Sequence, residues 1–117
     1  VMAQAREAAD LIASAVDSVY ASGPGSAEGV TVRVDAVWSL ILDNENSEVK
    51  IQVSTSGGVK EFQASLRYPL NGQHTLPDLS SGVYVVVADW PTSNGGEGIE
   101  VVAENKIIRI HINPLEG

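Results

Sequence analysis

The chain has 117 residues, no cysteine and a net charge of −8, from fifteen acidic and seven basic side chains. This length suits one domain that buries roughly two thirds of its unfolded surface, so a core can form without covalent staples. The acidic balance argues against binding to a nucleic-acid backbone, and the lack of cysteine excludes disulfide and thiolate chemistry. No apolar run is long enough to cross a bilayer.

Residues 1–21 are predicted to form one Ala-rich amphipathic helix. Apolar side chains recur three or four positions apart and share one face, whereas charged residues and serines take the other. The packing stripe consists of Ala5, Ala8, Ala9, Ile12, Ala15, Val16, Val19 and Tyr20. Gly23 and Pro24 end the helix, because glycine accepts a left-handed conformation and proline cannot continue the helical hydrogen bonds. No capping residue precedes the stripe, which favours the hypothesis that a longer helix, with an apolar segment before Val1, was cut here.

From residue 30 onward the apolar period changes from helical to two, which is typical of half-buried strands. The alternating apolar positions are Val30, Val32 and Val34, then Val49, Ile51 and Val53, then Phe62, Ala64 and Leu66, and last Ile108, Ile110 and Ile112. Residues 37–42 and 83–88 are apolar on both sides. This pattern predicts two central strands covered on both faces, with the helix as the cover.

The connections between these strands indicate antiparallel neighbours. Short polar segments at 43–46, 54–58 and 104–105 predict hairpins or tight loops. Longer loops are expected at 67–81 and 90–97, where proline and glycine interrupt the alternation. No helix-length stretch separates two strands, which excludes a doubly wound parallel sheet.

The predicted fold class is therefore α+β, with one N-terminal amphipathic helix packed on an antiparallel β-sheet or β-sandwich of about seven strands. We expect the helix at 1–22, a Gly/Pro linker turn at 23–29 and a β-rich head at 30–117 that forms one domain with the helix.

No constellation of residues predicts catalysis, a cofactor or a metal centre. His74 is expected in a loop and His111 on the polar face of the last strand, and neither has a cysteine, histidine or acid at ligand spacing. The serines lack a Gly-x-Ser-x-Gly context and have only these two histidines as candidate bases. We therefore expect both histidines to be exposed to solvent and the protein not to be an enzyme.

Asp43 to Glu48 place oxygen side chains at alternate positions, which resembles the opening of a calcium loop. The pattern departs from such a loop at Glu48, where glycine is needed, and at Ser54, where a bidentate acid is needed. A turn between two strands is the alternative, because Asp and Asn side chains commonly stabilise turns.

The sequence contexts of the two tryptophans predict different roles for them. Trp38 shares a face with Leu40 and Leu42, so we expect it to be buried. Trp90 precedes Pro91 at the mouth of a predicted loop, which makes Trp90 the candidate contact residue.

Three runs in the first part of the chain, 5–12, 16–20 and 22–25, are followed by the valine-alternating strand. Together they resemble the exit of the N-terminal helix in archaeal type IV pilin-like proteins with class III signal peptides. The resemblance covers residues 1–35, and the β region is similar in style. This sequence departs from the family pattern because it lacks the processing site and the apolar first half of the helix.

The resemblance implies a structural subunit or minor component of a type IV pilus-like surface filament, without catalytic activity. Such a protein is anchored in the membrane through the missing helix before assembly, lies at the cell surface or outside the cell, and pairs with other pilin subunits as a homo-oligomer. Residues 1–11 would then belong to the assembly helix and 12–20 would dock on the sheet.

Two alternatives stay open at this point. The whole alanine stripe can dock on the sheet of its own domain, as any α+β domain requires. The protein can also be a secreted β-sandwich binding module that recognises a glycan or a protein through its loops.

Overall fold

The computed structural model describes residues 2–43, 45–67, 74–90, 98–104 and 106–113. One helix, α1 (Met2–Ser22), precedes all the strands. The strands are β1 (Ala27–Val34), β2 (Val37–Asp43), β3 (Glu48–Thr55), β4 (Gly58–Ser65), β5 (His74–Leu79), β6 (Gly82–Asp89), β7 (Gly98–Glu104) and β8 (Ile107–Asn113). The predicted α+β class with one N-terminal helix is confirmed, and the described residues form eight strands where about seven were expected.

The strands form two four-stranded sheets. Sheet A has the order β1-β6-β8-β7, and sheet B has the order β4-β3-β2-β5. Neighbours in both sheets are antiparallel except β6 and β8, which run parallel. After β6 the chain first forms the edge strand β7 and then returns as β8, which lies between β6 and β7. β8 is antiparallel to β7 and therefore parallel to β6.

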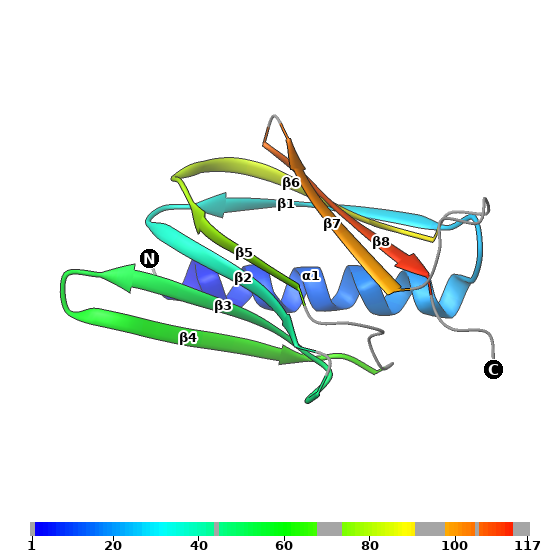
Figure 1. Ribbon diagram of the computed structural model, residues 1–117, viewed down its shortest axis with the longest axis horizontal. Coiled ribbons are helices and arrows are strands. Elements are labelled where there is room, and N and C mark those ends of the chain that lie inside the picture. The colour runs from blue at the N-terminus through cyan, green and yellow to red at the C-terminus, as the bar shows by residue number, and fades with distance from the viewer. Residues whose placement is uncertain (1, 44, 68–73, 91–97, 105, 114–117) are drawn as a thin grey trace.

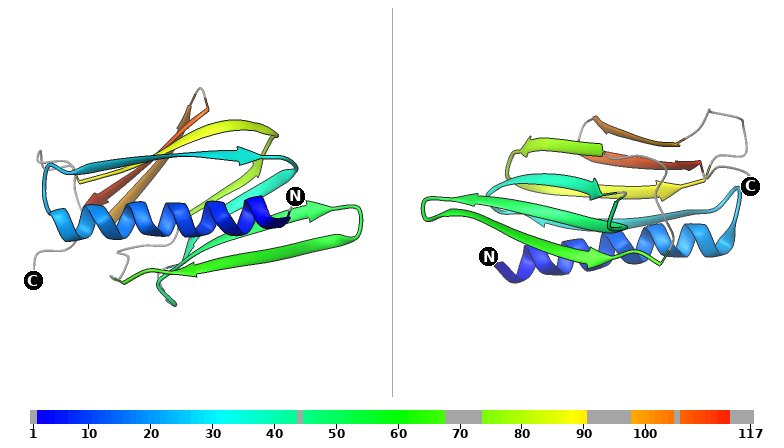
Figure 2. Two further views of the ribbon diagram at one scale, coloured as in Figure 1. Left: turned by 180° about the vertical axis from the view of Figure 1, so that it is seen from behind. Right: turned by 60° about the horizontal axis from the view of Figure 1, so that its bottom comes forward.

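The helix runs along the length of the molecule and lies on the open side between the two sheets (Figures 1 and 2). It contacts β1 and β6 of sheet A and β3 and β4 of sheet B. Since β1 and β4 are edge strands, α1 covers an edge of each sheet. At the opposite edges β5 approaches β7, so the two sheets and the helix enclose one core.

The predicted stop of the helix is confirmed. Gly23 adopts φ +88°, the left-handed conformation expected of a helix-ending glycine, and its N–H donates to the Val19 carbonyl at 3.0 Å. The Ser26 hydroxyl lies 2.6 Å from the Gly23 carbonyl oxygen and 3.0 Å from that of Val19. Ser26 therefore holds the chain as it turns from the helix into β1.

β1 begins at Ala27, three residues before the valine alternation does. Residues 27–29 pair through the backbone with β6, from Ala27 opposite Asp89 to Gly29 opposite Val87. Their side chains are exposed, so the hydrophobic pattern gives no signal for this part of the strand.

The core consists of the alternating apolar residues that face inward from both sheets, together with the helix stripe. Its strand members include Val32, Val34, Trp38, Leu40, Leu42, Val49, Ile51, Val53, Tyr84, Val86, Ala88, Ile108 and Ile110. The predicted period-two burial is thus confirmed for β1, β3 and the described side chains of β8. Phe62 and Ala64 of β4 are half-buried and pack against this core.

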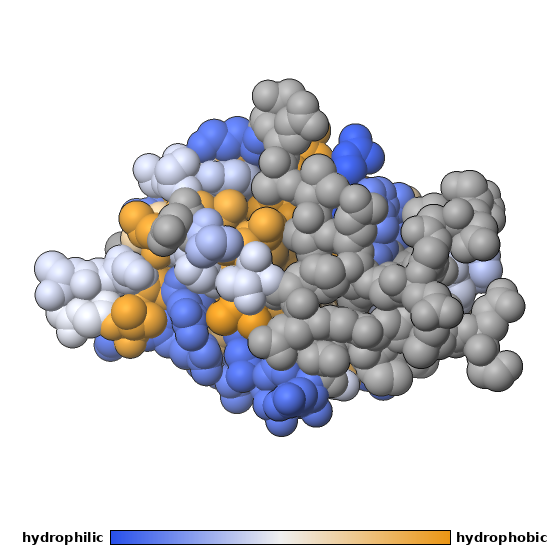
Figure 3. All heavy atoms as spheres, in the orientation of Figure 1, coloured by the Kyte–Doolittle hydropathy of each residue, from blue (hydrophilic) through white to orange (hydrophobic). Residues whose placement is uncertain are grey.

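The expectation that β2 and β6 are covered on both faces is wrong. Both are interior strands of their sheets, as predicted, but Val37, Val83 and Val85 on the outer faces are 44%, 50% and 41% exposed. The helix lies between the two sheets and therefore covers neither outer face. Figure 3 shows apolar surface between polar residues on the face turned to the viewer.

The predicted loop at 67–81 is wrong in its second half, where β5 pairs with β2. β5 is an edge strand, and its register with β2 shifts between Leu76, opposite Leu40, and Leu79, opposite Trp38. Pro77 lies at this irregularity, where a proline costs little because edges and bulges leave backbone groups outside the ladder. The proline that predicted a loop therefore belongs to an irregular edge strand.

Among the described residues, no helix is both long enough and apolar enough to span a membrane.

Candidate interaction surfaces

The predicted helix stripe is packed against the sheets of its own domain. Ala5, Ala8, Ala9, Ile12, Ala15, Val16 and Val19 are all buried, and Tyr20 is half-buried. Docking on the sheets therefore extends beyond 12–20 to Ala5, Ala8 and Ala9, and the assembly role of 1–11 stays a prediction. The small alanine side chains let α1 approach two sheet edges closely, and this contact already occupies them.

Among the described side chains, the outward face of α1 is mainly polar. Arg6, Glu7, Asp10 and Ser14 are exposed, and Leu11 beside them is 36% exposed. This face is the part of the helix that remains available to other molecules.

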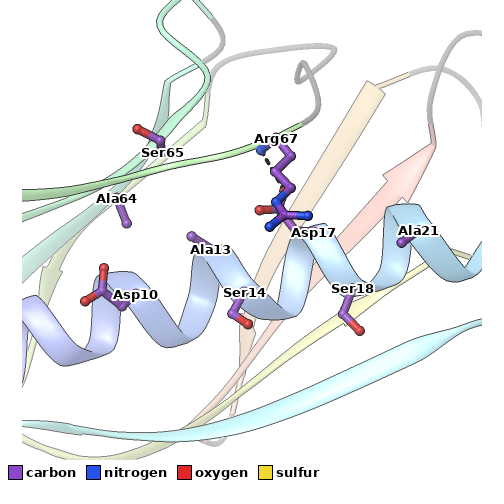
Figure 4. Close-up of a pocket in the computed structure, with 9 residues that line it drawn as sticks. All are labelled: Asp10, Ala13, Ser14, Asp17, Ser18, Ala21, Ala64, Ser65 and Arg67. Atoms are coloured by element: carbon purple, nitrogen blue, oxygen red, sulfur yellow. Dashed lines mark hydrogen bonds between the residues drawn. The ribbon is translucent and has the colours of Figure 1, made fainter.

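A shallow groove of about 440 Å³ runs between the polar side of α1 and the end of β4 (Figure 4). Ala13 and Ala64 face each other across it, and Asp10 lies at its rim. The backbone N–H of Arg67 donates to the Asp17 carboxylate at 2.9 Å. Asp17 thus ties the chain after β4 to the helix, which gives this carboxylate a structural role.

Trp90 holds the end of β6 against the end of the helix. Its ring meets the Tyr20 ring edge-on, with 6.1 Å between the ring centroids. The backbone N–H of Trp90 donates to the Ser26 carbonyl at 3.0 Å, and the backbone carbonyl of Trp90 accepts from the Gly25 N–H at 2.7 Å. Burial, with a smaller effect from the Asp17 charge, raises the pKa of Tyr20. Trp90 is half-buried and packs on the core. It is the first residue of the predicted loop at 90–97, and the rest of that loop lies outside the described residues.

Trp38 is buried, as predicted, with 2% of its surface exposed. Its indole N–H has no hydrogen-bond partner in the described structure. Packing rather than polar recognition therefore holds this ring in place.

Asp43 organises the turn between β2 and β3. One carboxylate oxygen accepts from the backbone N–H of Glu45 at 2.9 Å, and the other accepts from the Asn46 side-chain amide and the Lys50 ammonium, each at 2.9 Å. Lys50 first, and then Asn46, lower the pKa of Asp43 to about 2. The Lys50 cation and the backbone of the turn already bind this carboxylate, so the arrangement is that of a turn. Within the described residues, no group of three or more His, Cys, Asp or Glu side chains could hold a metal ion.

His111 is paired, not simply solvent-exposed as predicted. Its Nδ1 lies 2.6 Å from the Asp89 carboxylate, and both side chains are half-buried. The parallel register of β6 and β8 places Asp89 directly opposite His111, which sequence spacing alone does not reveal. His74 lies in β5 rather than in a loop, and its side chain is outside the described residues.

A row of outward-facing valines on β6, Val83, Val85 and Val87, forms what we call the valine patch. Val83 and Val85 are exposed and Val87 is half-buried. On the neighbouring strands, Arg33 lies opposite Val83 and Arg109 lies opposite Val87. The sequence pattern misses this surface because an apolar run on a central strand normally indicates burial.

The fold and these surfaces define a helix-braced β-sandwich with a mainly polar helix face and an apolar patch flanked by two arginines. No protein-family model, no curated protein and no solved structure matches this chain.

Proposed function

We propose that this protein is a non-catalytic structural subunit, or a minor component, of an archaeal type IV pilus-like surface filament. Such a subunit is held in the membrane by an upstream helix before assembly and then faces the cell exterior among its copies. The observation that carries the proposal is the packing of α1, whose stripe is buried from Ala5 to Val19 along the length of the head.

This packing suits a filament subunit for a mechanical reason. A helix buried on two sheet edges cannot swivel against its head, so an upstream continuation of the same helix would fix the orientation of every head along a filament. The polar outward face of α1 and the sheet surfaces then supply the contacts between heads.

The test begins with the gene. The proposal requires about twenty apolar residues encoded directly before Val1, preceded by a leader with a processing site. Expression of that complete product in its own cells should give filaments visible by electron microscopy and labelled by antibodies against this domain. A natural product that starts at Val1 without such a segment, or one that stays monomeric in the membrane, contradicts the proposal.

The alternative function is a secreted binding module that recognises a glycan or a protein through its loops. The half-buried Trp90 at the end of β6 is the observation that favours this alternative, because tryptophan rings commonly stack on sugars. A glycan array with the wild-type chain and Trp90→Ala tests it. Sugar binding that the substitution removes, at a temperature where the variant is still folded, would replace the filament proposal with the binding module.

A further inference from the structure

The valine patch is an apolar surface in the middle of sheet A. Val83 and Val85 are 50% and 41% exposed, and Val87 continues the row toward the other end of β6. Thr31 of β1 and Ile107 of β8 flank Val85 in register, so the apolar row extends sideways onto β8. Contiguous apolar surface rimmed by polar residues commonly marks an interaction site.

The charges around the patch indicate which partner fits it. Arg33 and Arg109, both exposed, stand at two ends of the valine row, and they are two of only seven basic residues in a chain of net charge −8. A complementary partner presents an apolar side chain between acidic ones, because charge complementarity steers the encounter and fixes the register.

The outward face of α1 has this composition. Leu11 is 36% exposed, and Glu7 and Asp10 next to it are exposed. Arg6 is exposed on the same face, so the two carboxylates of this face stand against one cation. Leucine can cover the valines while the two carboxylates approach the arginines, so the chain itself carries both halves of the contact.

We propose that the valine patch binds the acidic outward face of α1 of a second copy of this chain. The proposal rests on the proposed function in one respect, since a filament needs contacts between heads and the alanine stripe is already buried within each head. The two surfaces adjoin on each copy, because Thr31 and Arg33 beside the patch line one pocket with Glu7 and Leu11 of α1. Two copies that form the contact once leave a surface of each kind free for a further copy, whereas two copies that form it twice make a closed dimer.

Sedimentation velocity of the 117-residue chain over a concentration series, up to about 1 mM in about 0.15 M salt, tests this contact. The wild-type chain should sediment faster as its concentration rises. Val85→Lys should weaken the association at least tenfold. Val59→Lys is the matched control, because Val59 is 65% exposed on β4 of the other sheet, and this variant should associate like the wild type.

A charge exchange then identifies the partner surface. Arg109→Glu and Glu7→Lys should each weaken self-association severalfold, and an equimolar mixture of the two variants should recover part of it. Circular dichroism establishes that every variant is folded.

A wild-type chain that stays monomeric throughout the series overturns the proposal, as does a Val85→Lys variant that associates like Val59→Lys. A mixture that fails to recover association excludes α1 as the partner surface and overturns it as well. The contact and the proposed function can fail separately. A closed dimer that does not grow would support the contact but not its role in a filament. Filaments that Val85→Lys leaves unchanged would support the proposed function and refute the contact.

Discussion

Replacing Ile12 with alanine tests whether α1 is part of the core. Ile12 lies near the middle of the buried stripe and is 2% exposed, on a helix that contacts both sheets. The substitution removes three buried carbons, which at about 0.8 kcal/mol each corresponds to about 2.4 kcal/mol of lost transfer free energy. The cavity left behind adds to this loss, so we expect the free energy of unfolding to fall by about 3 to 4 kcal/mol.

The assay is urea unfolding followed by circular dichroism, with the midpoint and slope fitted for each variant. Leu11→Ala is the matched control, because it also removes three carbons but from a side chain that is already 36% exposed, and we expect a loss of about 1.5 kcal/mol without a cavity term. Equal effects of the two substitutions, or a loss below about 1 kcal/mol for Ile12→Ala, would refute the reasoning, since the helix would then be only loosely attached to the sheets.

Three further predictions concern the first half of the helix, its end and the turn after β2. Ala5→Leu should destabilise the domain by about 1 to 3 kcal/mol in the same urea assay, because Ala5 is fully buried and a larger side chain must displace its neighbours. An unchanged midpoint would mean that the first turns of α1 do not pack against the sheets. Gly23→Ala should lower the free energy of unfolding by about 1 kcal/mol, because Gly23 has φ +88°, which alanine adopts only with strain. Gly57 does not have a positive φ, so Gly57→Ala is the control and should have a smaller effect. Asp43 has its pKa lowered to about 2, so the stability from its charged form is complete above about pH 4 and is lost as the pH falls toward 2. The melting temperature of the wild type should therefore drop more steeply between these pH values than that of Asp43→Asn, and parallel curves for the two proteins would contradict the assignment.

The elements that could be predicted from the sequence are those whose signal is local. The helix stripe, its end at Gly23 and the alternation in β3 follow from residue periodicity and from the special backbone of glycine, and all are found in the structure. The burial of Trp38 was predicted for the same reason, because its neighbours on the strand set the face it occupies.

The features that could not be predicted depend on how distant segments meet. The exposure of Val83 and Val85 follows from the position of α1 between the sheets, and no pattern within residues 83–88 contains that information. The contact between His111 and Asp89 likewise depends on the parallel register of β6 and β8. The prediction of a loop at 67–81 was wrong at Pro77, because proline in an irregular edge strand has the same sequence signal as proline in a loop.

The surfaces proposed for assembly also arise at this tertiary level. The resemblance implies an assembly role for residues 1–11 and docking on the sheet for 12–20, and the structure buries the stripe from Ala5 to Val19 within one domain. Contacts between copies must then come from exposed residues such as Val85 and Leu11, which only the folded arrangement distinguishes from core residues.

The central claim, that α1 is an integral part of the head along its whole buried stripe, is tested most directly by native-state hydrogen exchange of the helix amides. If the claim holds, the amides of Ala8 and Ala9 should exchange as slowly as those of Ala15 and Val16, with the free energy of global unfolding. Rapid exchange at Ala8 and Ala9 beside slow exchange at Ala15 and Val16 would contradict it, because the first half of the helix would then open independently of the sheets.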